Sequence, residues 1–215
     1  SRRCGRRRPD RAAAVALTCP AHAIQTLGAH PTRIDHVDFL VADAHKWLLG
    51  PQGIGILYVR STHWNDMRPI LLGWKSVASS KDYASLAQEL SPSAKRYEPG
   101  SLNASGICGL HAALELISGC GIDAISRRIR MLRGRIESGL RAQGHLVLGR
   151  QSEDGPTGIV SFRHRVEDLG ELAKRLDAEG FVLSTRTDVA GHPCIRVAPH
   201  FYNTTEEVDR FLSRI

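Results

Sequence analysis

The chain has 215 residues, and its hydrophobic share of 42% and charged share of 24% are ordinary for a soluble globular protein. No apolar run approaches the roughly 20 residues that a membrane-spanning helix needs, which excludes a membrane-spanning protein. The formal net charge is +7, but residues 1–11 hold six arginines against one aspartate and so carry +5 of it. Because such a basic segment is typical of a tail and the rest is nearly neutral, we do not expect nucleic-acid binding.

Residues 1–20 show no clear period and are treated as a basic, unassigned tail. Their Arg-rich start and alanine-rich run at 12–17 faintly resemble a targeting segment, although a translated frame error or a cloning scar would look similar. The five cysteines are scattered and form no CxxC or metal-binding pattern. They indicate free thiols in a reducing cytoplasm and no metal site.

Two short apolar runs follow, at residues 37–42 and 53–59, and they predict strands buried on both faces. A polar turn with His45, Lys46, Gly50 and Pro51 lies between them. This arrangement predicts the middle of a mixed or parallel α/β sheet. Residues 61–103 are irregular and interrupted by Trp, Pro and Gly, and a connection of this length is usually functional or an interface.

Apolar residues at helical spacing predict two helices, over about 107–117 and 122–140, the second ending near Gly144. The last third predicts strands near 145–149, 158–163, 181–185 and 194–198. Two further helices begin at Asp168 and at Thr204, each with a glutamate three residues later, as in a capping box. These elements predict a small α+β domain with helices on one face of a sheet.

Lys46 is the first candidate for chemistry. A lysine held between two buried strands must reach water, pair with a charge or react, because a desolvated amine loses its proton more readily and becomes nucleophilic toward aldehydes. His45 beside it and the glycines at 50, 53 and 55 would leave room for a bulky anionic ligand. Taken alone, a loop lysine is more often a solvated charge.

The segment 43–58 (DAHKWLLGPQGIGILY) resembles the cofactor-lysine segment of the class V aminotransferases. These are pyridoxal-phosphate (PLP) enzymes of fold type I, and they include cysteine desulfurases and isopenicillin-N-epimerase-like proteins. Further segments resemble family motifs in the same order, at residues 23–29 (AIQTLGA), 97–103 (YEPGSLN) and 195–209. The resemblance covers roughly residues 21–215.

The resemblance implies how the cofactor is held. Lys46 would form the Schiff base (the internal aldimine) with PLP, and His45 would contact the cofactor phosphate. Gln25 would bond the PLP phenolic oxygen. Ser101 would reach across a homodimer to the phosphate of the partner's cofactor.

The resemblance also implies a substrate site for a small amino acid. Arg196 would hold the substrate carboxylate in a bidentate ion pair, with Arg186 as a second candidate for the same role. Lys46, once freed, could act as general base on the α-proton.

The implied fold class is α/β, with the C-terminal part of a PLP-dependent transferase major domain followed by a small α+β domain. We expect a partial PLP-binding major domain with a dimer-contact loop at 21–103. Connecting helices would follow at 104–143, and the small C-terminal domain at 144–215.

Three features depart from the family pattern. His22 stands where the family has an aspartate that pairs with the pyridine nitrogen, which weakens the case for transamination. The family's preceding half is missing, so we expect an N-terminally truncated chain. Cys194 directly precedes Ile195-Arg196, so we interpret it as a strand residue and do not expect desulfurase activity.

Two hypotheses therefore stand at this point. The first is a cytoplasmic, homodimeric PLP enzyme of the class V family, aminotransferase- or epimerase-like, that acts on a small amino acid through Lys46. The alternative is a catalytically inactive fragment of such an enzyme. A third idea, a nucleic-acid-binding module, predicts salt-dependent binding that vanishes when residues 1–11 are removed.

Overall fold

The structure is a computed structural model that describes residues 20–82, 84, 89–149 and 157–215. The predicted basic tail lies outside these residues except for its last position. The chain divides into two compact units, one of residues 1–25 and 32–115 and the other of residues 26–31 and 116–215. Both mix strands and helices, so the α/β class is confirmed.

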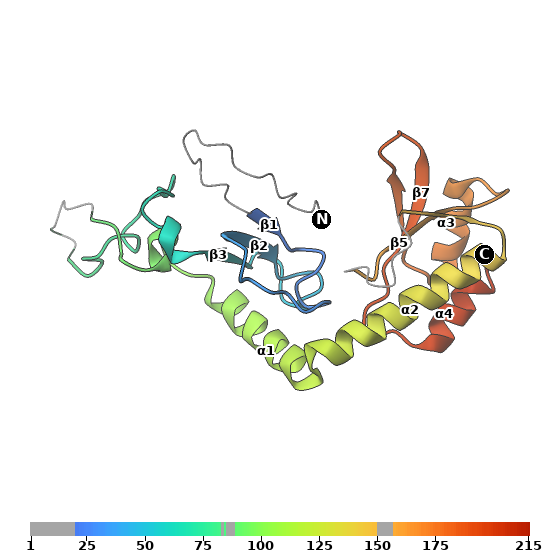
Figure 1. Cartoon of the computed structure of the whole chain (residues 1–215), viewed down its shortest axis with the longest axis horizontal. Helices are drawn as coiled ribbons and strands as arrows, with labels where there is room; N and C mark the ends of the chain where they lie inside the picture. Colours follow the sequence, from blue (N-terminus) through green and yellow to red (C-terminus); the bar gives the residue numbers. More distant parts are fainter. Residues whose placement is uncertain (1–19, 83, 85–88, 150–156) are drawn as a thin grey trace, which may run out of the picture. The chain divides into compact units, whose positions relative to one another are not determined.

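A three-stranded sheet forms the frame of the first unit (Figure 1). β1 (Pro20–His22) pairs in parallel with β2 (Phe39–Asp43), and β2 pairs antiparallel with β3 (Gly55–Val59). β2 is the central strand. The prediction of a mixed or parallel sheet is confirmed as a mixed sheet, but of the two predicted strands only β2 lies in its middle, and β3 is an edge strand among the described residues.

The prediction that these two strands are buried on both faces is wrong for the described residues. Leu40 and Ala42 are 3% and 5% exposed, whereas Val41 and Leu57, which pair across β2 and β3, are 42% and 47% exposed. Successive side chains of a strand point to opposite faces, so one face of the sheet is packed and no described element covers the other. An apolar run does not show which of its faces finds a partner.

Residues 61–82, 84 and 89–103, the described part of the segment 61–103, are irregular, as predicted. They hold two short 3-10 helices, η1 (Ser61–His63) and η2 (Ala94–Tyr97), and one isolated bridge between Val77 and Leu90. Arg96 is 8% exposed, and it donates to the carbonyl of Ser91 at 2.8 Å and to that of Trp64 at 2.6 Å. This buried guanidinium joins the two ends of the segment in place of regular structure.

The two predicted helices are α1 (Ala104–Cys120) and α2 (Ile122–Ala142). The α2 stripe is buried as expected, and Gly144 follows the helix with a positive φ of 81°. On α1, Ile107 and Leu114 are 43% and 37% exposed, while Leu110 and Ile117 are buried. No single described helix is long and apolar enough to cross a membrane, and α1 and α2 would suffice only together, as a sharply bent pair.

The second unit contains a four-stranded antiparallel sheet in the order β4-β5-β7-β6. The strands are β4 (Leu146–Leu148), β5 (Val160–Arg163), β6 (Ser184–Thr187) and β7 (Pro193–Val197). β6 begins later than the predicted 181–185 strand. The reason is that Phe181 first packs edge-on against Phe211, with ring centroids 5.9 Å apart.

Helices α2, α3 (Leu169–Ala178) and α4 (Thr205–Leu212) pack on one face of this sheet (Figure 1). The prediction of helices on one face is confirmed, and so are both caps. Asp168 Oδ1 accepts the N–H groups of Gly170 and Glu171, and Thr204 and Glu207 form a reciprocal capping box. The core consists of Leu132, Ile136, Leu140, Val160, Phe162, Leu172, Leu176, Ile195, Val197, Val208 and Phe211.

His145 lies buried just before β4, with 8% of its surface exposed. Its Nδ1 accepts the backbone N–H of Arg165 at 3.2 Å, and its ring centroid lies 4.4 Å from that of His164. Burial lowers the pKa of His145, and the nearby charges of His164 and Arg165 lower it further. The folded unit therefore favours the neutral imidazole.

We expect the free energy of unfolding of this unit to fall as the pH drops below the ordinary histidine pKa of 6.5. Because the folded pKa is lower than the unfolded one, the unfolded chain binds more protons in this window, and acid favours unfolding until the folded pKa is passed. Urea unfolding between about pH 8 and about pH 5 measures the slope. His145→Gln should reduce it, and an unchanged slope in this variant would contradict the assignment.

Candidate functional site

Lys46 lies in a closed turn between β2 and β3. The N–H of Ala44 donates to the carbonyl of Ile54 at 3.0 Å, and the N–H of Gly50 donates to the carbonyl of Ala44 at 2.9 Å. Leu49 has a left-handed φ of 56°, which costs a non-glycine residue on the order of 1 kcal/mol. The half-buried Lys46 is therefore presented by a fixed and locally strained backbone.

Trp47 joins this turn to the segment that follows β1. The indole is 5% exposed, and its Nε1–H donates to Oε1 of Gln25 at 3.1 Å. Two of the predicted cofactor residues, Gln25 and Lys46, are thus brought to one place by a contact that spans 22 positions of sequence. Their roles toward a cofactor stay predictions.

His45 is exposed and lines a hollow together with Asp43 and residues 52–55. A neighbouring hollow shares Asp43 and Gly55 with the first and extends to His22 at the end of β1. Gly55 is required here, because a Cβ at this position would lie 2.8 Å from the carbonyl oxygen of Ala42 on the paired strand. Asp43 was not singled out from sequence, although an acidic residue directly after a buried run was the available signal.

The first turns of α1 pack directly against the lysine turn. A Cβ on Gly109 would lie 2.5 Å from Cγ of Pro51, so only glycine allows the two backbones to approach this closely. Leu110 covers Gly50 in the same way, since a Cβ on Gly50 would lie 3.2 Å from Cδ1 of that leucine. The helix is a rigid support for the turn that carries Lys46.

Asn103 completes this support. Its Oδ1 accepts the N–H of Gly106 at 2.9 Å, and its Nδ2 donates to the carbonyl of Gly53 at 3.1 Å. One side chain therefore caps α1 and holds the strand that leaves the lysine turn. Sequence reasoning included Asn103 in a motif without giving it a role, although an asparagine just before a helical stripe predicts a cap.

Ser101 is exposed two residues before Asn103. The loop that carries it is fixed at Pro99, whose carbonyl accepts the N–H of Lys75 at 3.4 Å. No hydrogen bond of the Ser101 hydroxyl is found among the described residues. Its predicted contact with a phosphate in a partner subunit stays a prediction.

Arg196 and Arg186 belong to the second unit, on the adjacent strands β7 and β6. Arg196 is half-buried, and its Nε is shielded from solvent without a hydrogen-bond partner among the described residues. Burial lowers the pKa of Arg196, and the charge of Arg186 lowers it further. Arg186 is exposed and donates to the carbonyl of Thr185 at 3.0 Å.

Cys194 lies in β7 and is 4% exposed, which confirms its interpretation as a strand residue. The β6–β7 connection, residues 188–192, contains no cysteine. It is a tight turn in which the N–H of Asp188 donates to the carbonyl of His192 at 2.8 Å. Cys108, Cys120 and Cys194 are free thiols.

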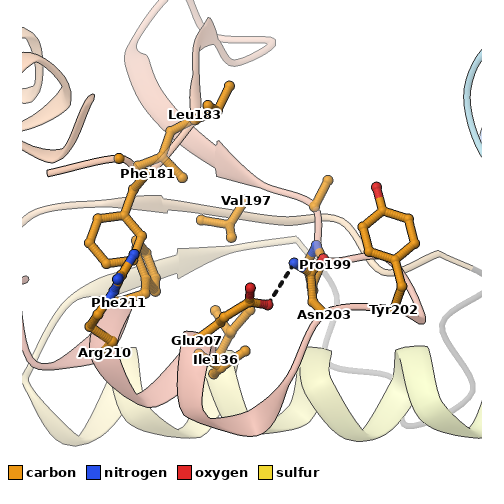
Figure 2. Close-up of a pocket in the computed structure, with 14 residues that line it drawn as sticks. Ile136, Phe181, Leu183, Val197, Pro199, Tyr202, Asn203, Glu207, Arg210 and Phe211 are labelled. Carbon is orange, nitrogen blue, oxygen red and sulfur yellow. Dashed lines mark hydrogen bonds between the residues drawn. The ribbon is translucent and has the colours of Figure 1, made fainter. Parts of the chain in front are cut away.

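A separate groove of about 360 Å³ lies in the second unit between α4 and the 180–183 segment (Figure 2). Glu207 accepts from Nδ2 of Asn203 at 3.0 Å, and the guanidinium of Arg210 lies 4.6 Å from the ring centre of Phe181. Its charged groups are thus engaged within the fold. None of the predicted site residues lines this groove.

Residues 17–211 match the family model described as Aminotransferase class-V. A probable cysteine desulfurase of Pyrococcus abyssi is 30% identical over 188 residues, which cover 81% of this chain and 45% of the relative. A cysteine desulfurase of Escherichia coli (strain K12 / DH10B) is 32% identical over 207 residues, with 88% of this chain and 48% of the relative covered. The chain spans about half the length of the curated relatives it matches.

Among solved structures, the chain likewise matches about half of a cysteine desulfurase and about half of a cystine C–S lyase. The apo structure of a cysteine desulfurase from Thermococcus onnurineus NA1 matches 91% of this chain and 51% of its own, with a TM-score of 0.83 and 26% identity. The cystine C–S lyase C-DES, in complex with its reaction product cysteine persulfide, matches with a TM-score of 0.77 and 25% identity. It covers 88% of this chain and 49% of its own.

Proposed function

Because the chain belongs to the class V aminotransferase family, we propose that it supplies the cofactor lysine, Lys46, and the carboxylate-binding arginine, Arg196, of a PLP-dependent enzyme acting on a small amino acid. The observation that supports the proposal is the fixed structure of the turn that carries Lys46. Its strained Leu49, the Trp47–Gln25 hydrogen bond and its α1 support all hold one amine in place.

The residues present fit the cofactor. Lys46 offers an amine for the cofactor aldehyde, and the glycines at 53 and 55 leave a hollow beside His45. The shielded and unsatisfied Nε of Arg196 favours an anionic ligand, because a buried donor without a partner costs free energy. His22 is an imidazole rather than a carboxylate, which favours reactions that need less electron withdrawal than transamination.

PLP, when bound, withdraws electrons from the bonds at the α-carbon of an attached amino acid. Lys46 Nζ would anchor the cofactor and, when displaced by the substrate amine, accept the α-proton. The guanidinium of Arg196 would orient the substrate through its carboxylate. The Trp47–Gln25 bond would keep the lysine turn in register during these steps.

The curated relatives are named cysteine desulfurases, but a persulfide-forming cysteine is not part of this proposal. Cys194 is buried within β7, and residues 188–192 provide no replacement. The proposed reaction is an aminotransferase- or epimerase-like transformation of a small amino acid instead, and of the two His22 favours the epimerase-like one.

A homodimer in the cytoplasm is part of the same proposal. The homodimer is supported by an exposed apolar run beside the loop of Ser101. Ile70, Leu71, Leu72 and Trp74 in this run are 97%, 72%, 53% and 45% exposed. A run of this kind is typical of a protein interface. Gly73, within the run, lies against Pro99 of that loop.

The test is covalent binding of PLP by the purified chain. After incubation with PLP and dialysis, the wild type should keep a visible absorbance band, and borohydride reduction should fix the cofactor mass on Lys46. Lys46→Ala should lose both signals, because no other amine is held in this turn. Lys81→Ala, which removes an exposed lysine, is the matched control and should keep them.

A wild type without the band, or a Lys46→Ala variant with the same band, would contradict the proposal. The first result would favour the alternative of an inactive chain. The second would place the reactive amine elsewhere.

A further inference from the structure

Arg186 and Arg196 lie on the same face of the second sheet. Arg196 pairs with Ser184 and Arg186 pairs with Cys194 across β6 and β7. Since directly opposed residues share a face and Ser184 and Arg186 are two apart, both arginines lie on the face opposite the core residue Ile195. Diagonal neighbours of this kind are roughly 7–8 Å apart.

The charges on this face do not balance. Arg163 forms an ion pair with Asp188, and the same carboxylate accepts the N–H groups of Ala190 and His192, each at 2.9 Å. Asp188 is therefore fully engaged. Among the described residues, neither Arg186 nor Arg196 has an ion pair with a carboxylate, so two guanidinium charges lie side by side.

This juxtaposition is unfavourable without a ligand. Each guanidinium repels the other, and beside burial, which is the larger cause, this repulsion lowers the pKa of Arg196. The partly buried Arg196 is screened less by water than a surface charge would be. One monocarboxylate would neutralise only one of the two charges, whereas a ligand with two acidic groups would neutralise both.

We propose that the substrate of this site is an amino acid with an acidic side chain, held by Arg196 at its α-carboxylate and by Arg186 at its second acidic group. This rests on the proposed function for the role of Arg196. A planar guanidinium pairs with one carboxylate through two parallel N–H···O hydrogen bonds. Two separate guanidinium groups therefore match a ligand with two carboxylates better than they match a single compact anion.

The test compares ligands that differ only in the second acid group. The 15N-labelled full chain is titrated with L-aspartate and L-asparagine, and with L-glutamate and L-glutamine, while its amide NMR shifts are followed. The wild type should bind the acid of at least one pair about tenfold more tightly than its amide.

Three variants locate the effect. Arg186→Gln should bind acid and amide equally, because only the second contact is lost. Arg196→Gln should weaken binding of both. Arg127→Gln removes an exposed arginine of α2 and lowers the net charge by the same amount, so it should keep the wild-type preference.

Equal binding of acid and amide by the wild type, or no measurable binding of either, would overturn the proposal. So would an acid preference that survives in Arg186→Gln or disappears in Arg127→Gln. Inorganic sulfate that displaces the acid at equal concentration would assign the face to compact anions and reject the dicarboxylate. Because no PLP is used, a failure here is distinct from a failure of the Lys46 test.

Discussion

Replacing Phe162 with alanine is expected to lower the free energy of unfolding of the second unit by about 3–5 kcal/mol. The ring is 0% exposed, and it packs edge-on against Phe211 with centroids 6.4 Å apart. It lies on the core face of β5, where α2, α3 and α4 converge on the sheet. Truncation therefore removes contacts with several elements at once and leaves a cavity that a close-packed core cannot refill.

Denaturant unfolding, together with native-state hydrogen exchange of the β5 and β7 amides, measures this loss. Val182→Ala is the matched control, because Val182 is 91% exposed in the same unit and its truncation should stay within about 0.5 kcal/mol of wild type. A Phe162→Ala variant that loses less than about 1 kcal/mol would show that this ring is not the centre of the core.

The second large effect is expected at the lysine turn. A Cβ added at Gly50 would lie 2.7 Å from Cβ of Ala44, whose surface is 0% exposed, and 3.2 Å from Cδ1 of Leu110. Both neighbours are packed, so the turn itself must shift. Overpacking of this kind typically costs about 1–3 kcal/mol. Because the displaced backbone carries Lys46, covalent trapping of PLP should fall with it.

Gly50→Ala is compared with Gly134→Ala. Gly134 lies within α2, and no atom outside its own helix backbone lies within 4 Å of the Cβ position, so alanine there should stabilise the helix by about 0.5–1 kcal/mol. The measurements are thermal unfolding and the yield of borohydride-fixed cofactor. A Gly50→Ala chain with wild-type stability and wild-type trapping would show that the packing of α1 does not position the lysine.

Much of the fold could be predicted from local sequence patterns. The α2 stripe, the caps at Asp168 and Thr204 and the strands on either side of Lys46 could each be predicted, because each depends on residues within a few positions of one another. The family could be identified in the same way, from short motifs in a fixed order. The burial of β2 and β3 could not, because it depends on which distant element covers each face.

The candidate site shows the same division. Lys46, His45 and Gln25 could be proposed from motif positions, but the Trp47–Gln25 bond that joins them could not. Asn103 and Asp43 were given no role from sequence. The contact of Asn103 with Gly53 and the place of Asp43 beside His45 depend on the tertiary structure. The pairing of β6 with β7 is what places Arg186 beside Arg196.

The sequence by itself determined the type and approximate place of nearly every element, the family, and the lysine on which the proposed chemistry depends. These follow from periodicity, capping and motif spacing, which are properties of short segments. Only the tertiary structure decided which strand faces are packed, how α1 supports the turn of Lys46, and why Arg186 and Arg196 share one face. Such contacts form between residues on different helices, strands and turns, and they depend on how these elements pack and pair in space.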